Sequence, residues 1–479
     1  MTTTNLMVAG RLVPAQSGKT FSVYAPATET VICEVASGGV AEVDAAVAAA
    51  RQGFDVWSGL APREREEVLL RAADLVAAEG ESRFLNTLID ESGSAISKAR
   101  GEINYTVDLL RTAAGEVRRL YGETFPNDRP DRMSMVFRNP LGVVAVVSPF
   151  NAPLALLTKM AAFPLAAGNS VVIKPSSETP LTALAFGQLM VDAGLPPEAI
   201  SVLPGSGREC GAALVAHADI DCIALTGSTE TGIKIGQQAM ERFRPVQLEL
   251  GGKSALLVLR DADPKKAAKI AAQGIFTHGG QICMANSRIV VEREVYDDFI
   301  AALKIEAESL TIGDLYDPAT TYGPLINSRA VEQVMSHIDT ALADGAQLLT
   351  GGQIHDGLVV QPTVLLSPVR DKGVWREESF GPVTSVVAVD SLDEAIAVAN
   401  DSEFGLSGAV LTKNIQWGMK AAKEINAGSV HIGMHSYQSN ALAPIGGSGF
   451  SGIGRSGGAY SIEEFTEVKW ISVELGESV

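Results

Sequence analysis

Apolar residues in the first part of the chain recur every three or four positions, the spacing of amphipathic helices. Two sets show this most clearly, the first made of Val43, Val47, Ala50, Phe54 and Trp57 and the second of Val68, Leu69, Ala72 and Leu75. The first part of the chain, ahead of residue 143, is therefore predicted to be mainly helical.

The pattern changes near residue 143, where short β-rich runs begin to alternate with helical stretches or Gly-rich turns. Five such runs cover 142–147, 170–174, 199–203, 221–225 and 245–250. Strands that alternate with helices predict a parallel, doubly wound sheet, and ligands of such sheets bind beyond the carboxyl ends of the strands.

A second α/β unit is predicted after residue 251. Its β-rich runs include 287–292, 384–389 and 408–412, and its helical stretches cover 265–275, 294–309, 328–344, 391–400 and 414–425. The predicted fold class is therefore α/β, with two doubly wound parallel-sheet domains. An active site is expected in the cleft between them.

Composition excludes several classes of protein. The net charge is −18, from 38 basic and 56 acidic residues, with no basic cluster, which argues against nucleic-acid binding and anionic membranes. We see no secretory signal and no apolar run long enough to span a bilayer. The cysteines are sparse and none are spaced as CxxC, so neither a disulfide scaffold nor a metal site is expected, and a reducing cytoplasm is the simplest location. They are Cys33, Cys210, Cys222 and Cys283.

Three residues form a candidate catalytic set. Cys283 lies in the Gly-rich stretch FTHGGQICMANSR, where its sulfur can be approached and its backbone N–H can donate to an oxyanion. Asn151 follows the first β-rich run and offers a side-chain amide as second donor. Glu249 closes the fifth run, where a carboxylate can activate water. Taken singly, Asn151 fits a turn residue and Glu249 a solvated strand end.

The motifs LELGGKS, GGQIC, EESFGPV (377–383) and TGSTETG (226–232) stand in an order and spacing that resemble the NAD(P)-dependent aldehyde dehydrogenase family over nearly the full chain. On composition alone TGSTETG also fits an ordinary capped β-α turn. The resemblance implies that residues 1–119 and 141–251 form a dinucleotide-binding domain and that 252–445 form a catalytic domain. It also implies a small β extension for oligomerisation, in which a hairpin at 120–140 pairs with a C-terminal strand within 460–479.

The resemblance implies a mechanism as well. The Cys283 thiolate attacks the aldehyde carbon, Asn151 and the Cys283 N–H hold the oxyanion, hydride passes to the nicotinamide, and Glu249 activates the water that releases the acid. The family often has Glu where Ser177 stands, so either NAD or NADP is expected as cofactor, although neighbouring Glu178 could restore the carboxylate. The expected cofactor residues are Pro149, Phe150, Lys174, Ser176, Ser177, Gly207, Gly211, Thr226, Gly227, Ser228, Gly232, Leu250, Glu378 and Phe380.

The substrate region most resembles the aromatic branch of the family, which takes benzaldehyde, vanillin and salicylaldehyde. Residues expected to contact the substrate are Asn151, Lys159, Ile282, Met284 and Tyr437. Lys159 can reach a phenol oxygen or a carboxylate, or it can be a solvated helix lysine. A semialdehyde or aliphatic substrate is the alternative, followed by an acyl-CoA-forming relative, an esterase or a non-catalytic protein. The expected partners are a small-molecule aldehyde and further copies of the chain, as a homodimer or homotetramer, with no nucleic acid and no membrane.

Overall fold

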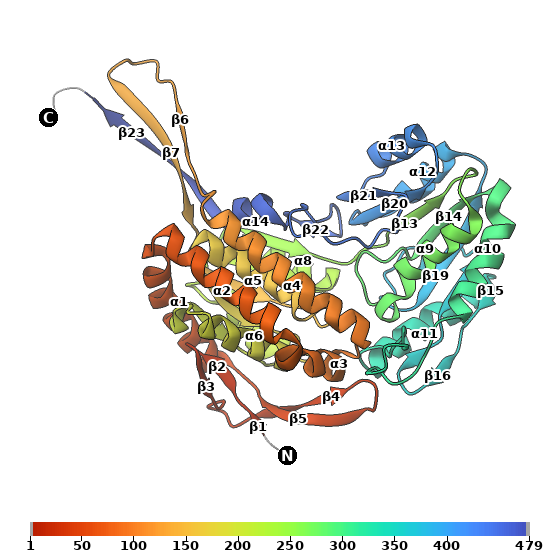
Figure 1. The fold of residues 1–479 in the computed structure, drawn as a ribbon, viewed down its shortest axis with the longest axis horizontal. Coiled ribbons are helices and arrows are strands. Elements are labelled where there is room, and N and C mark those ends of the chain that lie inside the picture. Colours follow the sequence, from red (N-terminus) through yellow and green to blue (C-terminus); the bar gives the residue numbers. More distant parts are fainter. Residues whose placement is uncertain (1–2, 476–479) are drawn as a thin grey trace.

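The structure is a computed structural model that describes residues 3–475. It consists of two α/β bodies and an arm that projects from the first of them (Figure 1). The expected fold class is confirmed, because each body is built on a mainly parallel sheet with helices on both faces.

The first sheet has eight strands in the order β22-β12-β11-β8-β9-β10-β2-β3. Its parallel centre consists of the five strands expected from the sequence, namely β8 (Val143–Val147), β9 (Ser170–Lys174), β10 (Ile200–Val202), β11 (Cys222–Thr226) and β12 (Val246–Glu249). Antiparallel edges are added by β2 (Leu6–Val8), β3 (Arg11–Val13) and β22 (Gly452–Ile453).

The central strands are mostly apolar, and β8 is apolar at every position, because both faces of the sheet are covered. Val144 and Val146 of β8 pack on one side against a core with α2 (Pro62–Gly80), α4 (Ile96–Val117), α5 (Ala155–Ala167) and α6 (Pro180–Asp192). Val143 and Ala145 pack on the other side with α1 (Val40–Gly59), α7 (Ala212–Ala216) and α8 (Thr229–Met240). Because these five strands are parallel, their carboxyl ends lie at the same edge of the sheet, which is where a ligand is expected to bind.

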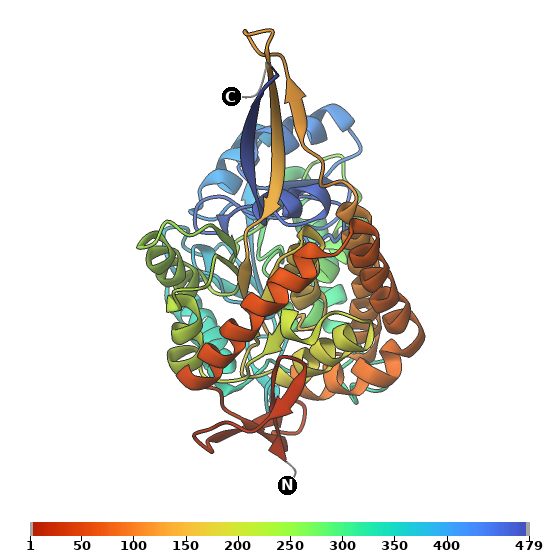
Figure 2. The same cartoon turned by 90° about the vertical axis from the view of Figure 1, so that its left-hand side faces the viewer.

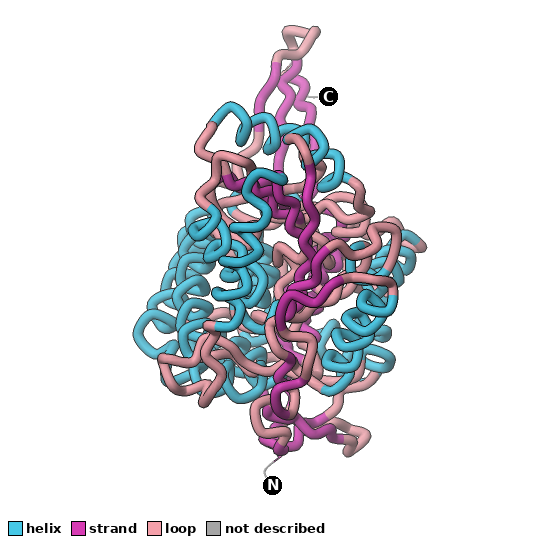
Figure 3. Tube along the Cα trace, turned by 90° about the vertical axis from the view of Figure 1, so that its right-hand side faces the viewer, coloured by secondary structure: helices cyan, strands magenta, loops and turns pink. Residues whose placement is uncertain are grey.

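The second sheet has seven strands in the order β15-β18-β19-β14-β13-β20-β21. They are β13 (Ala255–Val258), β14 (Arg288–Glu292), β15 (Gln347–Thr350), β18 (Thr363–Leu366), β19 (Val383–Val389), β20 (Ser407–Leu411) and β21 (Ser429–Ile432). All pair in parallel except β15. The helices are α9 (Pro264–Phe276), α10 (Arg293–Glu308), α11 (Ser328–Ala343), α12 (Leu392–Asn400) and α13 (Ile415–Glu424). Viewed from this side, strands run down the middle of the molecule with helices to either side (Figure 3).

The arm is a three-stranded antiparallel sheet of β6 (Glu123–Phe125), β7 (Arg132–Pro140) and β23 (Thr466–Glu474). The register of β23 on β7 runs from Thr466 opposite Pro140 to Glu474 opposite Arg132. The arm stands clear of both bodies (Figure 2). Large apolar side chains on it are exposed, among them Trp470 at 64%.

The N-terminal region departs from the helical prediction. Residues 3–36 form strands, β2 and β3 in the first sheet and β1 (Thr3–Thr4), β4 (Thr20–Ala25) and β5 (Thr30–Ala36) in a sheet of their own. These strands are short and partly exposed, so their apolar positions do not form a continuous run. The remaining α-helices and β-strands of the described residues are α3 (Asn86–Ser92), β16 (Ile354–Asp356), β17 (Val359–Val360) and α14 (Gly458–Glu464). Within residues 3–475 no helix combines the length and apolar character that crossing a membrane requires.

Candidate active site

A cavity of about 700 Å³ lies between the two bodies, and Cys283 lines it. Asn151 and Glu249 reach the same cavity from the carboxyl ends of β8 and β12. The structure thus brings together all the residues that the sequence suggested for catalysis and substrate contact, namely Asn151, Lys159, Glu249, Ile282, Cys283, Met284 and Tyr437.

The loop that carries Cys283 depends on glycine. His278, Gly279 and Gly280 all have positive φ, at 54°, 61° and 73°. A Cβ at position 280 would lie 2.2 Å from the Gly381 carbonyl oxygen, and one at position 252 would lie 2.5 Å from the Cys283 carbonyl oxygen. The glycines of GGQIC and LELGGKS therefore permit the close approach of the cysteine loop to its neighbours.

Cys283 is partly exposed, whereas the other three cysteines are buried. Burial of its sulfur raises the pKa of the thiol to about 12, with Glu378 and Glu249 adding to the rise and Lys159 opposing it. The thiol is therefore protonated at rest, and ionisation requires a group that takes its proton or a positive charge nearby.

Asn151 is held in place from two sides. Its Nδ2 donates to the Gln281 carbonyl at 2.8 Å, which ties it to the cysteine loop, and its own carbonyl accepts from Lys98 Nζ at 2.7 Å. Lys98 forms an ion pair with Glu102 at 2.6 Å. Glu102 in turn accepts from two amides at the start of α5, at 2.7 and 3.0 Å. This chain of contacts from α4 fixes the backbone on which Asn151 stands.

Glu249 is the last residue of β12 and is only 9% exposed, so the interpretation of a solvated strand end is wrong. Ser456 Oγ donates to its Oε1 at 3.2 Å. Burial raises the pKa of Glu249, and the Lys159 ammonium and the Ser456 hydrogen bond oppose the rise. Lys159 is itself buried at 4% exposure, so it is not a solvated helix lysine. Burial lowers the pKa of Lys159, whereas Glu249 and Cys283 raise it.

Most of the residues expected to bind the cofactor follow the carboxyl ends of the five parallel strands β8 to β12. Ser228 caps α8, where its Oγ accepts from the Thr231 amide at 3.3 Å. A Cβ at position 232 would lie 2.4 Å from Leu250, so glycine allows α8 to pack close to that strand end. Glycine at 232 therefore leaves space at the start of α8, and a helix start of this kind favours an anionic group.

Two further groups fit a dinucleotide. Lys174, at the end of β9, is 5% exposed and donates to the Pro175 carbonyl at 2.9 Å. Glu378 comes from the second body, and one of its oxygens accepts from the Gly252 amide at 3.0 Å. Burial raises the pKa of Glu378 to about 7. A carboxylate accepts about four hydrogen bonds, so Glu378 retains capacity for ribose hydroxyls. Phe380 meets Phe150 edge-to-face, with ring centres 5.8 Å apart.

The Ser177 hydroxyl donates to the Gly205 carbonyl at 3.1 Å. Glu178 accepts from the Asn327 amide of the second body at 3.0 Å. The carboxylate next to Ser177 is thus already bound to another residue.

Sequence reasoning missed several groups in and around the cavity. Lys98, Glu102 and Tyr105 lie on α4, far from any recognised motif, and their polar side chains sit on a helix whose apolar pattern gives no sign of them. The Tyr105 hydroxyl and His278 Nε2 are buried without a hydrogen-bond partner among the described residues. Burial raises the pKa of Tyr105 and lowers that of His278, so both are neutral at pH 7.

Comparison with known proteins agrees with this geometry. The model of the family described as "Aldehyde dehydrogenase family" matches residues 12–471. The chain is 38% identical to a vanillin dehydrogenase of Pseudomonas fluorescens, over 98% of both chains. It is 35% identical to a glutarate-semialdehyde dehydrogenase of Pseudomonas putida, over 98% of this chain and 97% of that one. The structure of an aldehyde dehydrogenase from Bacillus cereus in complex with NAD⁺ superposes with a TM-score of 0.97 at 37% identity, covering 99% of this chain and 97% of the other. The chain therefore belongs to the aldehyde dehydrogenase family, whose members are NAD(P)-dependent oxidoreductases that act on aldehydes.

Proposed function

We propose that this enzyme oxidises aromatic aldehydes that carry a ring hydroxyl, of the hydroxybenzaldehyde or vanillin type, to their carboxylic acids. The observation that carries the proposal is the pairing of apolar walls with isolated polar atoms in one cavity. Its apolar lining includes Ala152, Ala155, Leu156, Phe276, Ile282, Met284, Leu310 and Ile445. Such walls suit a ring, and the vanillin dehydrogenase relative supports the same class of substrate.

The ring hydroxyl is assigned to the Tyr105 hydroxyl or to His278 Nε2, two polar atoms on residues that line the cavity. Both atoms are buried, neutral and without partners among the described residues, and a phenol group can accept from the Tyr105 hydroxyl or donate to the His278 nitrogen. Tyr437, which stacks on His435 with ring centres 5.9 Å apart, adds a flat wall to the same cavity.

The proposed chemistry starts at Cys283. Lys159, whose ammonium lowers the pKa of both the thiol and Glu249, favours the thiolate. The thiolate adds to the aldehyde carbon, and the oxyanion that forms is held by donors from Asn151 Nδ2 and the Cys283 amide. When bound, the nicotinamide supplies the two-electron acceptor that turns this adduct into a thioester.

Glu249 completes the reaction. As a carboxylate it removes a proton from water, and the hydroxyl oxygen attacks the thioester carbon. The carbon–sulfur bond breaks, Cys283 departs as thiolate and the carboxylic acid is released. An acyl-CoA-forming enzyme has no need of a water-activating base, so Glu249 favours hydrolysis.

For the cofactor we propose that Lys174 and Glu378 bind ribose hydroxyls and that Gly227 and Ser228 bind the pyrophosphate. Ser177 adds no negative charge and Glu178 is engaged with Asn327, so a 2′-phosphate is tolerated and both NAD and NADP are used.

A semialdehyde is the second candidate substrate. Lys269, exposed on α9, lines the cavity and could pair with a distal carboxylate, and a semialdehyde dehydrogenase is among the relatives. Lys98, which also lines the cavity, is already engaged by Glu102 and Asn151 and is not available for a substrate carboxylate, which favours the neutral aromatic substrate.

A substrate panel with the Tyr105→Phe variant tests the proposal. The wild type is expected to give a kcat/KM for 4-hydroxybenzaldehyde or vanillin at least about tenfold above that for succinate or glutarate semialdehyde. A pair between the substrate carboxylate and the exposed Lys269 contributes little, and a buried carboxylate without a close partner costs more than about 1.4 kcal/mol. Tyr105→Phe removes only one hydroxyl and should reduce the preference for 4-hydroxybenzaldehyde over benzaldehyde by about tenfold. Tyr24→Phe, at an exposed tyrosine on β4, is the control. A preference for semialdehydes would overturn the assignment.

We also propose that the arm joins copies of the chain into a homodimer or homotetramer in the cytoplasm. Its exposed apolar side chains and free strand edge favour a partner, and the four free cysteines fit a reducing compartment. Sedimentation equilibrium that finds only monomer would refute the assembly.

A further inference from the structure

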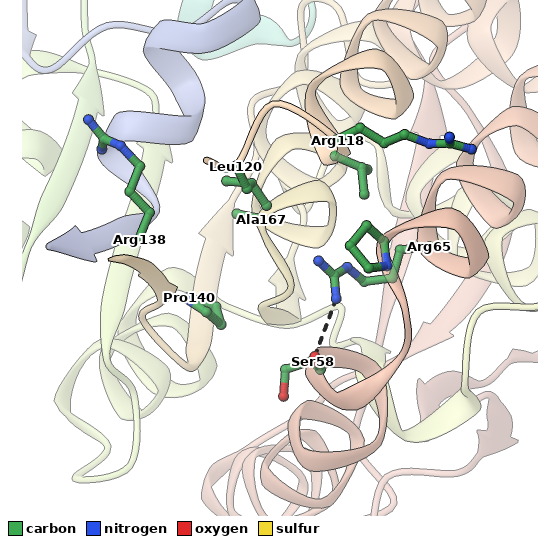
Figure 4. Close-up of a pocket in the computed structure, with 9 residues that line it drawn as sticks. Ser58, Arg65, Arg118, Leu120, Arg138, Pro140 and Ala167 are labelled. Carbon is green, nitrogen blue, oxygen red and sulfur yellow. Dashed lines mark hydrogen bonds between the residues drawn. The ribbon is translucent and has the colours of Figure 1, made fainter. Parts of the chain in front are cut away.

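A second cavity, of about 380 Å³, lies at the base of the arm, well away from Cys283. It is enclosed by the ends of α1, α4 and α5, the start of α2 and the end of β7 (Figure 4). Its lining residues are Ser58, Pro62, Arg65, Val117, Arg118, Leu120, Arg138, Pro140 and Ala167. Three of them are arginines and none is acidic, although the chain as a whole carries a net charge of −18.

Arg65 is the central feature of this cavity. It is only 7% exposed, and its Nη1 donates hydrogen bonds to two backbone carbonyls, that of Leu60 at 2.8 Å and that of Ser58 at 3.3 Å. Its Nε has no partner among the described residues. Figure 4 shows the guanidinium extending from α2 into the cavity, with one terminal nitrogen on Ser58 and the other directed toward Ala167 and Leu120. Burial lowers the pKa of Arg65, and within residues 3–475 no carboxylate opposes this.

The buried Arg288 shows how this protein otherwise treats such a group. Arg288 is 3% exposed, and all three of its guanidinium nitrogens donate to backbone carbonyls. It also lies over the Trp375 ring at 5.5 Å. Arg65, in contrast, has hydrogen-bond partners on only one of its nitrogens among the described residues, and it lines a cavity. A buried guanidinium beside a cavity without a carboxylate is the arrangement that an anion would complete.

Two further arginines stand at the rim. Arg118 is paired with Glu66, and Arg138 lies 3.8 Å from Glu463. Their side chains are 55% and 30% exposed, and their heads turn outward from the cavity (Figure 4). Exposed ion pairs of this kind contribute little to stability, so both guanidinium groups can turn toward a bound anion.

We propose that this cavity binds a small molecule through an oxyanion, either a carboxylate or a phosphate group. Arg65 provides the buried donor, and Arg118 and Arg138 add positive charge at the entrance. The apolar walls of Pro62, Leu120 and Pro140 leave room for a small organic body attached to that group. The site is separate from the proposed catalytic chemistry and does not depend on which aldehyde the enzyme oxidises.

Isothermal titration calorimetry on the full-length enzyme tests the site. The enzyme is first saturated with NAD⁺ so that the cofactor groove cannot bind the probe, and ionic strength is held constant with chloride. Inorganic phosphate is titrated in one arm and acetate, which lacks the aromatic ring of the proposed product, in the other. The wild type is expected to bind at least one probe with one site per chain, and the tighter probe identifies the group as phosphate or carboxylate.

The Arg65→Met variant keeps the volume and removes the charge, and it is expected to weaken binding at least tenfold. Arg63→Met is the matched control because Arg63 lies on the same helix but is exposed and paired with Glu67; its affinity should equal that of the wild type. If Arg65→Met does not fold, the double variant Arg118→Gln with Arg138→Gln is expected to weaken binding at least threefold. Absence of binding by both probes, or unchanged affinity in the variant that folds, would overturn the proposal.

Discussion

The contact between Glu102 and Lys98 gives the sharpest test of how the fold holds the proposed oxyanion donor. Replacing Glu102 by glutamine keeps an oxygen that can accept from the first amides of α5 but removes the charge that pairs with Lys98. Lys98 in turn holds the Asn151 carbonyl. The substitution should therefore lower both stability and turnover.

The size of the effect follows from burial. The side chains of Lys98 and Glu102 are 16% and 3% exposed, and breaking a buried pair by removing one partner costs about 3–5 kcal/mol. Lys98 keeps the Asn151 carbonyl as a second acceptor, so the lower end, about 3 kcal/mol, is expected. For a chain of this length the unfolding entropy is near 1 kcal/mol per degree, so Tm should fall by about 3 °C. A loosened Asn151 should reduce kcat by about 10- to 100-fold.

Glu91 provides a matched control. It is fully buried and accepts from the amides of Leu181 and Thr182 at 2.9 and 2.8 Å, the same role at the start of α6. No lysine or arginine of the part of the chain that the structure describes pairs with it. Glu91→Gln should change stability by less than about 1 kcal/mol and leave kcat unchanged. Thermal melts and steady-state kinetics of both variants are the assay. Equal effects of the two substitutions, or a Glu102→Gln enzyme with wild-type Tm and kcat, would refute the reasoning.

Two further predictions concern pH and cofactor choice. Glu249 must be ionised to act as base, and burial raises its pKa while Lys159 lowers it. The acid limb of the pH–kcat profile should therefore lie above the ordinary carboxyl range, and it should move up by about one pH unit in Lys159→Met. A profile whose acid limb does not move in that variant would contradict this. Ser177→Glu should lower kcat/KM for NADP by about tenfold or more with little change for NAD, because its carboxylate repels the 2′-phosphate. A wild-type preference for NAD over NADP above about 10³ would show that Ser177 does not permit NADP.

The sequence predicted the parallel strands of the first sheet well because they are buried on both faces, which leaves an unbroken apolar run in β8 and β9. The N-terminal strands were missed for the opposite reason. β3 and β4 are short and partly exposed. β3 joins the first sheet only through its neighbour β2, and β2 pairs with the distant strand β10. A pattern read along one segment carries no information about a distant strand that completes the sheet.

The same limit applies to the site. Cys283, Asn151 and Glu249 could be singled out because each stands at a strand end or in a Gly-rich loop. Lys98 and Glu102 could not, because their significance arises only when α4 packs against α5 and brings a buried ion pair beside Asn151. Arg65 was missed likewise, since its lack of a carboxylate partner is a property of the packed structure.

The central claim is that the Cys283 sulfur forms a covalent bond with the substrate carbonyl carbon. The most direct measurement is intact-protein mass spectrometry of a Glu249→Gln enzyme, quenched in acid after mixing with NAD⁺ and 4-hydroxybenzaldehyde, since slow hydrolysis should let the thioester accumulate. The predicted result is a burst of NADH together with one acyl group per chain, and that group should map to Cys283. The acyl group should be absent from the double variant Glu249→Gln, Cys283→Ala. NADH formation at the wild-type rate by Cys283→Ala, or an acyl group on another residue, would contradict the account.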